Sequence, residues 1–167
     1  AWPILKEQKI PFILFVNTRE VGSYGYMNWA QIKEIAKEKF VHIGNHSFSH
    51  EYLIDRGQEE IISDINRAII DFKNNLEYSS PFFSYPFGEY SNDFKKIVKD
   101  LGFKYAFGQH SGVVDETKDF YELPRFPINE AYGELKRFKT VLQTIPLKFK
   151  SITPEEKYIT DATLLLY

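Results

Sequence analysis

Four short apolar runs, alternating with segments of helical periodicity, constrain the fold of this 167-residue chain more than any other feature. Each run has the length and the β-branched or aromatic content of a strand buried on both faces. The segments between them are long enough to form helices that cross from one strand to the next. This alternation predicts βα units and a mostly parallel sheet, as an open doubly wound sheet or part of a barrel. The predicted strands are 10–16, 40–44, 82–85 and 104–107.

The residues between these runs carry helix start signals and apolar stripes. Asn28, with Gln31 three residues later, has the capping-box pattern at the start of a helix that reaches residue 40. The longest helix is predicted over 58–76, and Ser91 caps another that ends at Gly102. We also expect the end of a helix at 2–9, loops at 18–27 and 109–120, an extended segment at 123–128, a helix at 134–144 and an edge strand at 164–166.

The length fits one compact domain, and no internal repeat is present. We expect this domain to occupy residues 1–150, with 151–167 as a C-terminal tail or edge segment. The sequence begins Ala1-Trp2-Pro3, without Met and inside an apolar pattern. This start predicts that the chain begins part-way into the domain.

Composition excludes several classes of protein. No apolar run approaches the roughly 18 residues of a transmembrane helix. Lysine plus arginine (21) nearly balances aspartate plus glutamate (23), which argues against a nucleic-acid binder. There is no cysteine, so disulfide scaffolds and thiolate metal sites are excluded. Aromatic residues make up 17% of the chain, and they are either core or the lining of a groove in which sugars stack.

Two histidines, His46 and His50, follow the second predicted strand at a spacing of four residues. The carboxyl ends of parallel strands are where chemistry collects. On a helical turn this spacing would direct both imidazoles to the same side. Two converging neutral imidazoles form part of a metal site, most often for zinc. The alternative is a pair of surface histidines in a polar loop.

A catalytic zinc needs about three protein ligands and an open position for water. His42 alternates within the second strand, and we expect it in the core or supporting a ligand through a hydrogen bond. His110 lies in a Gly/Ser loop, and we expect it to be solvated. The candidates for a third ligand within the chain, none at a persuasive spacing, are Glu51, Asp55, Glu89 and His110.

A second candidate segment, residues 84–90, follows the third predicted strand. Pro86 fixes its own φ angle, and Gly88 tolerates conformations that other residues avoid. Backbone N–H groups in such a turn can bind an anion or a developing oxyanion. The alternative is a plain connection from strand to helix.

Together these segments resemble the polysaccharide deacetylases, the NodB-homology domain of carbohydrate esterase family 4. The segment 45–50 (Asn-His-Ser-Phe-Ser-His) matches that family's His-[Ser/Thr]-x-x-His motif, and 85–88 (Tyr-Pro-Phe-Gly) matches the end of its Arg-x-Pro-Tyr-Gly motif. Weaker similarities cover 2–17, 102–108 and 123–126, so that the resemblance spans roughly residues 1–145. The Tyr-Pro-Phe-Gly-Glu-Tyr form is most similar to the branch that deacetylates poly-N-acetylglucosamine.

The resemblance implies an α/β fold, a distorted (β/α) barrel of fewer than eight strands, with the first strand absent from this chain. Residues 1–150 would then be a NodB-like domain that is incomplete at its N-terminus. The implied activity is metal-dependent hydrolysis of N-acetyl groups on a polymer of β-linked N-acetylglucosamine. The implied cofactor is a divalent metal, zinc first, with cobalt or nickel as alternatives. The implied location is the periplasm, the cell surface or the medium of a bacterium, with the cytoplasm as an alternative.

The resemblance also implies roles for individual residues. His46 and His50 would bind the metal, the Phe87 N–H would hold the oxyanion, and Arg125 would orient the catalytic carboxylate. Tyr85, Pro86 and Gly88 would contact the substrate, with the Tyr85 ring lining the sugar groove.

Three features depart from the family pattern. The Asp-Asp motif, which supplies the general base and the third ligand, is absent, as is the catalytic acid histidine. Ser84 stands where many relatives have Arg. We therefore expect this chain alone to be inactive as a hydrolase. The alternatives are a catalytically inactive carbohydrate-binding domain on the same barrel and a different metallohydrolase.

Overall fold

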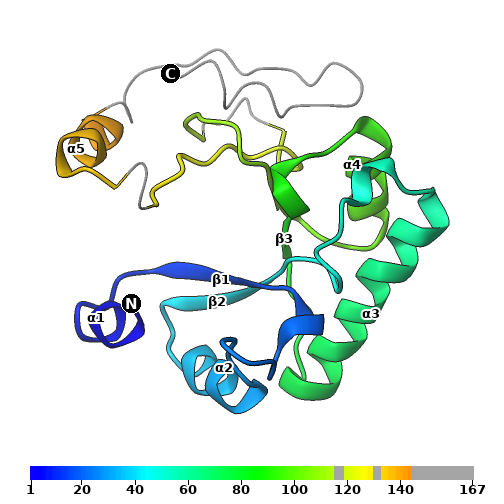
Figure 1. Ribbon diagram of the computed structural model, residues 1–167, viewed down its shortest axis with the longest axis horizontal. Helices are drawn as coiled ribbons and strands as arrows, with labels where there is room; N and C mark the ends of the chain where they lie inside the picture. Colours follow the sequence, from blue (N-terminus) through cyan, green and yellow to red (C-terminus); the bar gives the residue numbers. More distant parts are fainter. Residues whose placement is uncertain (115–118, 130–132, 144–167) are drawn as a thin grey trace.

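The structure, a computed structural model, describes residues 1–114, 119–129 and 133–143. Within these ranges, four parallel strands form one sheet in the order β1-β2-β3-β4 (Figure 1). Strands that follow one another in the chain are neighbours in the sheet, which confirms the predicted succession of βα units. The strands are β1 (Phe12–Val16), β2 (Val41–Asn45), β3 (Phe82–Ser84) and β4 (Tyr105–Phe107).

Five α-helices and three short 3-10 helices accompany the sheet in the described residues. They are α1 (Trp2–Glu7), α2 (Trp29–Ala36), α3 (Gln58–Leu76), α4 (Asn92–Asp100), α5 (Leu135–Gln143), η1 (Thr18–Glu20), η2 (Leu53–Asp55) and η3 (Pro86–Gly88). Both predicted caps are confirmed. Asn28 Oδ1 accepts the Gln31 N–H at 3.0 Å, and Ser91 Oγ accepts the Phe94 N–H at 3.1 Å. The predicted extended segment at 123–128 contributes one isolated bridge, between Phe107 and Leu123.

The helix α3 joins two apolar cores. Ile61 and Ile65, in its N-terminal half, pack with residues of β3, β4 and α4. Phe72, near its C-terminus, packs in a second cluster with residues of β1, β2 and α2. In Figure 1, α2, α3 and α4 lie along one side of the sheet, and α5 lies on the other. The side that carries α2 to α4 is therefore the packed outer layer of the domain.

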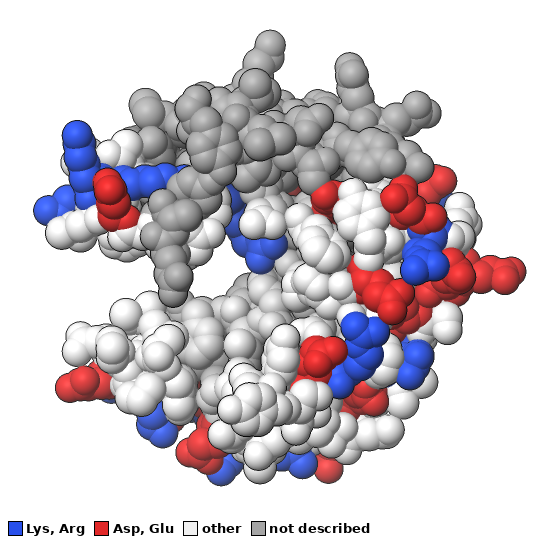
Figure 2. All heavy atoms as spheres, viewed as in Figure 1, with Lys and Arg blue, Asp and Glu red and all other residues white. Residues whose placement is uncertain are grey.

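The sheet is continuous on one side of β2 and nearly open on the other. β2 pairs with β1 over five residues, from Phe12↔Val41 to Val16↔Asn45, but with β3 only at Asn45↔Phe83. Within the described residues β1 pairs only with β2 and is an edge strand. The space-filling view shows a hollow between the part that carries β1 and β2 and the part that carries α5 (Figure 2).

Two histidine predictions are wrong. His42 is exposed, between the buried residues Val41 and Ile43. Those two residues pack toward the helices, so strand alternation turns His42 to the opposite side of the sheet. His110 is not solvated but only 5% exposed. The loop after β4 folds inward there, and Gly108 makes room for the His110 ring. A Cβ at position 108 would lie only 2.8 Å from His110 Nδ1.

The predicted edge strand at 164–166 and the domain boundary at residue 150 lie outside the described residues. In the part of the chain that the structure describes, no helix has both the length and the apolar character that crossing a membrane requires.

Candidate active site

The candidate site residues lie at one end of the sheet, where the parallel strands end. His46 directly follows β2, η3 follows β3 after one residue, and Arg125 lies two residues beyond the bridge at Leu123. His46, His50, Phe87 and Arg125 line one cavity of about 490 Å³. The structure thus brings the histidine pair and the Pro-Phe-Gly turn together, at the end of the sheet where parallel folds place their chemistry.

The two imidazoles lie side by side in this cavity. Their ring centroids are 4.7 Å apart, with an interplanar angle of 69°. His46 Nδ1 lies 2.7 Å from the Ser84 carbonyl oxygen. A carbonyl oxygen only accepts, so His46 Nδ1 carries the proton and Nε2 keeps its lone pair. A ring oriented in this way by a backbone carbonyl is typical of a metal ligand.

His46 is also held in the neutral form that a metal ligand needs. Burial lowers its pKa from 6.5 to about 4. The hydrogen bond to Ser84 acts in the opposite direction, and the nearby His50 and Arg125 lower the pKa further. At neutral pH the imidazole is therefore uncharged and can donate its lone pair.

The loop that carries both histidines is not a helical turn, so the predicted helical arrangement of the two imidazoles is wrong. Ser47 has φ 67° and His50 has φ 53°, both in the left-handed region. The loop is closed by its own side chains, because Asn45 Oδ1 accepts the Ser47 N–H at 2.8 Å and Ser47 Oγ accepts the His50 N–H at 3.0 Å. The two imidazole rings nevertheless lie together, because the left-handed residues turn the loop more tightly than a helix would.

The turn η3 places an aromatic ring at the cavity. Phe87 has φ 58°, and its ring, 49% exposed, lies 4.8 Å from the His50 ring and 5.6 Å from the Tyr52 ring. The next residue must be glycine. Gly88 has φ 75°, and a Cβ there would lie 2.1 Å from Gln109 Cβ and 2.7 Å from Gln109 N.

Tyr85 does not present a ring face to a sugar, and this part of the prediction is wrong. Its side chain is fully buried, its ring stacks on Tyr90 at 4.9 Å, and its hydroxyl donates to the Tyr121 carbonyl at 2.8 Å. Tyr85 therefore forms the base of the cavity. Pro86 and Gly88 are buried as well, so the exposed ring of the segment is that of Phe87.

Arg125 lines the same cavity. Its Nε donates to the Gly108 carbonyl at 2.7 Å, and its guanidinium carbon lies 5.6 Å from the centre of the Phe15 ring. Burial lowers the pKa of Arg125 from its usual value. A guanidinium fixed in this way retains further N–H donors for a carboxylate.

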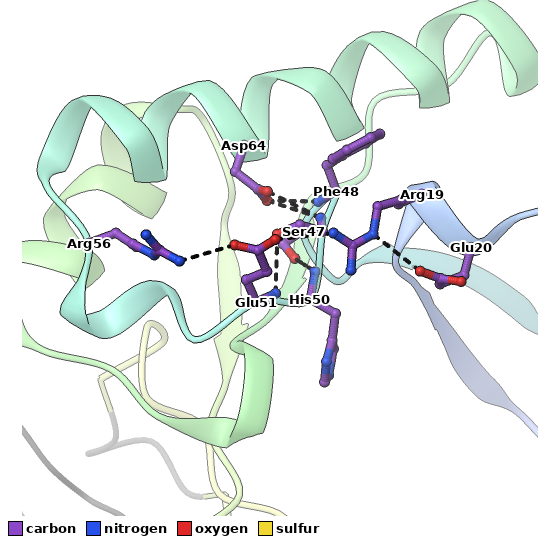
Figure 3. A network of polar contacts seen from close by, with 9 residues as sticks. Arg19, Glu20, Ser47, Phe48, His50, Glu51, Arg56 and Asp64 are labelled. Atoms are coloured by element: carbon purple, nitrogen blue, oxygen red, sulfur yellow. Dashed lines mark hydrogen bonds and ion pairs between the residues drawn. The ribbon is translucent and has the colours of Figure 1, made fainter.

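None of the four proposed third ligands joins the histidine pair. Glu51 instead pairs with Arg19 at 3.2 Å and Arg56 at 3.3 Å, away from the His50 ring (Figure 3). Among the described residues, no group of three His, Cys, Asp or Glu side chains lies close enough to hold a metal ion. The donors at hand are therefore two imidazoles, which fit part of a zinc, cobalt or nickel site.

Three groups that support the site were not predicted from the sequence. The Ser84 carbonyl orients His46, and the Phe15 ring lies 6.4 Å from the His46 ring. Asp64 of α3 accepts hydrogen bonds from the histidine loop (Figure 3). No sequence signal identifies a carbonyl, but Phe15 lies within a predicted strand, and Asp64 lies within the predicted helix 58–76, next to its apolar stripe.

Comparison with known proteins supports the resemblance. A family model described as polysaccharide deacetylase matches residues 1–106. A curated relative is the poly-beta-1,6-N-acetyl-D-glucosamine N-deacetylase of Staphylococcus aureus, which is 27% identical over 143 residues. The match covers 78% of this chain and 49% of the relative, so the chain spans about half the length of the curated relatives it matches.

Two solved structures share the fold. IcaB from Ammonifex degensii superposes with a TM-score of 0.75 at 23% identity, covering 87% of this chain and 66% of that chain. Streptococcus pyogenes deacetylase PplD, in complex with acetate, superposes with a TM-score of 0.78 at 20% identity, covering 87% of this chain and 63% of that chain. The α/β fold with its parallel sheet is thus similar to that of these deacetylases.

Proposed function

This chain belongs to the polysaccharide deacetylase family, and we propose that it forms the metal-binding side of an enzyme that removes N-acetyl groups from a β-1,6-linked N-acetylglucosamine polymer. The observation that carries this proposal is the cavity in which His46, His50 and the η3 turn meet. The name of the Staphylococcus aureus relative supports the choice of polymer.

His46 and His50 would hold a divalent metal, zinc first, with cobalt or nickel as alternatives. The residues present fit this role, since His46 is neutral and keeps its Nε2 lone pair. When bound, such a metal polarises a carbonyl group and lowers the pKa of water.

The chain itself would stabilise the charge that develops during hydrolysis. Water adds to the acetamide carbon, the carbon–nitrogen bond breaks, and acetate and a free amine are released. The Phe87 N–H would donate to the oxygen of the acetamide as it becomes negatively charged. Arg125 would orient the carboxylate that takes the proton of the water.

Two exposed rings would contact the sugar. Phe87 and Tyr52 lie 5.6 Å apart beside His50 and are 49% and 38% exposed. Aromatic faces next to the histidine pair suit the apolar faces of pyranose rings. We assign this role to Phe87 and Tyr52 in place of Tyr85.

The remaining groups would come from outside the described residues. A complete site needs a third metal ligand, a general base and a general acid that protonates the leaving amine. In this proposal they are supplied by a strand that pairs with β1 on the side away from β2, where the described residues place no strand, and by segments next to it. The substrate is a polymer, so we place the enzyme in the periplasm, on the cell surface or in the medium.

One observation favours a second candidate function, a catalytically inactive carbohydrate-binding domain. Within the described residues the histidine pair has no third ligand, while the exposed rings of Phe87 and Tyr52 are retained. Such a domain would bind the polymer without hydrolysing it.

The experiment is an assay of acetate release from a β-1,6-linked N-acetylglucosamine oligomer by the full-length protein. His50→Ala should lower the rate by at least about 100-fold, since it removes a metal ligand. His42→Ala is the matched control, because His42 lies on β2 but is exposed outside the cavity, and it should leave the rate unchanged. Binding of the oligomer without acetate release by the wild-type protein would establish the binding domain instead.

A further inference from the structure

We propose that Asp64 of α3 is a positioning residue that fixes the backbone of the histidine loop, so that His46 and His50 converge on one point. This inference rests on the metal-binding role proposed above. Asp64 is half-buried, and it lies on the helix that ties the two apolar cores together.

The histidine loop requires an external support because its backbone is strained. Ser47 and His50 both adopt positive φ angles, which non-glycine residues rarely occupy. Such conformations persist only where the surrounding structure holds them. The hydrogen bonds that Asn45 Oδ1 and Ser47 Oγ accept close the loop on itself, but they do not fix its orientation relative to the sheet and helices.

Asp64 links the middle of the loop to α3, in addition to the backbone hydrogen bonds that join the loop to β1 and η1. Its Oδ1 accepts the Phe48 N–H at 2.9 Å, and its Oδ2 accepts the Ser49 N–H at 3.2 Å. Figure 3 shows the carboxylate directed at the loop backbone while the His50 side chain points away from α3. One carboxylate thus holds the two N–H groups that lie between Ser47 and His50, the two strained residues.

The same side of α3 supports this arrangement one and two turns further on. The Arg67 guanidinium carbon lies 3.6 Å from the centre of the Phe48 ring. Asp71 Oδ2 accepts the Thr18 hydroxyl at 2.6 Å, and the Thr18 N–H donates to the Ser47 carbonyl at 3.3 Å. The polar residues of α3 next to its apolar stripe therefore contact the loop directly and through η1.

The test compares the zinc affinity of four variants of the full-length protein by calorimetry. Asp64→Ala should weaken zinc binding by about 10- to 100-fold, the usual effect of removing a group that orients a ligand. Asp64→Asn keeps one acceptor oxygen and should recover part of the affinity. Glu60→Ala, an exposed acid one turn earlier on α3, is the matched control and should bind like the wild type.

Ile65→Val distinguishes the positioning role of Asp64 from a merely structural one. It removes one methylene from a core side chain on the same helix. It should lower stability but leave zinc affinity unchanged. If Asp64→Ala lowers only stability, as Ile65→Val does, the positioning role is wrong.

Amide hydrogen exchange in the metal-free chain gives a second, independent readout. The Phe48 and Ser49 amides should exchange at least about 10-fold faster in Asp64→Ala than in Glu60→Ala. If the wild type binds no zinc, the proposed metal site fails, while the exchange rates still decide whether Asp64 holds the loop. Equal exchange in Asp64→Ala and Glu60→Ala would overturn the inference.

Discussion

Tyr85 and Tyr90, on either side of η3 in the sequence, are both buried but differ in the hydrogen bonding of their hydroxyl groups. Tyr85 and Tyr90 stack on each other, and both are fully buried. The Tyr85 hydroxyl donates to the Tyr121 carbonyl, whereas the Tyr90 hydroxyl has no hydrogen-bond partner among the described residues. Burial raises the pKa of both phenols above 10, and the charges of Glu122 and Asp119 act in the same direction.

Tyr90→Phe and Tyr85→Phe should therefore have different effects on the free energy of unfolding. Tyr90→Phe removes a buried hydroxyl without a partner, so stability should stay the same or rise. Tyr85→Phe leaves the Tyr121 carbonyl unpaired and should lower stability by about 1 kcal/mol. Urea unfolding measures both, and a larger loss for Tyr90→Phe would contradict the assignment.

The same pair predicts the response to alkaline pH. Above pH 10 the tyrosines of the unfolded chain lose their protons, while Tyr85 and Tyr90 keep theirs in the folded chain. The unfolded state then binds fewer protons, so stability should fall as the pH rises through 10. Tyr90→Phe should make this fall shallower, and an ultraviolet titration of tyrosinate measures how many phenols resist ionisation.

At the scale of single elements, the η3 turn depends on one glycine. Gly88 combines a positive φ with the close approach of Gln109, so a side chain there meets both strain and a clash. Gly102, after α4, has φ 91°, but a Cβ added there would have no neighbouring atom within 4 Å, so a side chain meets strain alone.

The two glycines form a matched pair of substitutions. Gly102→Ala should lower the free energy of unfolding by about 1 kcal/mol, the strain of a left-handed residue. Gly88→Ala should lower it by at least about 2–3 kcal/mol, because the Gln109 backbone must also move. Thermal unfolding of both variants measures the difference, and equal losses would mean that η3 tolerates a side chain.

The strands and helices could be predicted because each is set by a local pattern. Periodicity and caps such as Asn28 and Ser91 predict the described strands and α-helices, with shifts of a few residues at most of their ends, but not the three 3-10 helices. The wrong predictions for single residues concern the burial of their side chains. Neither the exposure of His42 nor the burial of His110 and Tyr85 can be read from spacing, since each depends on residues distant in sequence.

Only part of the candidate site could be predicted, because local patterns determine which residues follow each strand but not how the loops fold. The pairing of His46 with His50 and the nearby turn follow from residues that end successive parallel strands. The left-handed residues of the histidine loop do not, because the support from Asp64 comes from another element. The conformation that brings the two imidazole rings together therefore depends on contacts with residues distant in sequence.

At the scale of the whole molecule, the cavity lies across the weakest join of the sheet. His46 belongs to the β1–β2 part and η3 to the β3–β4 part, and the two parts are paired only at Asn45↔Phe83. The hydrogen bond from His46 to Ser84 and the packing of α3 against both cores complete this join. The spacing between the histidine pair and η3 therefore depends on α3.

The most direct test of the account is to locate the metal by anomalous X-ray scattering from crystals of the zinc-loaded protein. We expect a zinc peak in the cavity about 2.0–2.1 Å from His46 Nε2 and from a ring nitrogen of His50, beside η3. A zinc ion bound elsewhere, for example at His42, with none between His46 and His50, would contradict it.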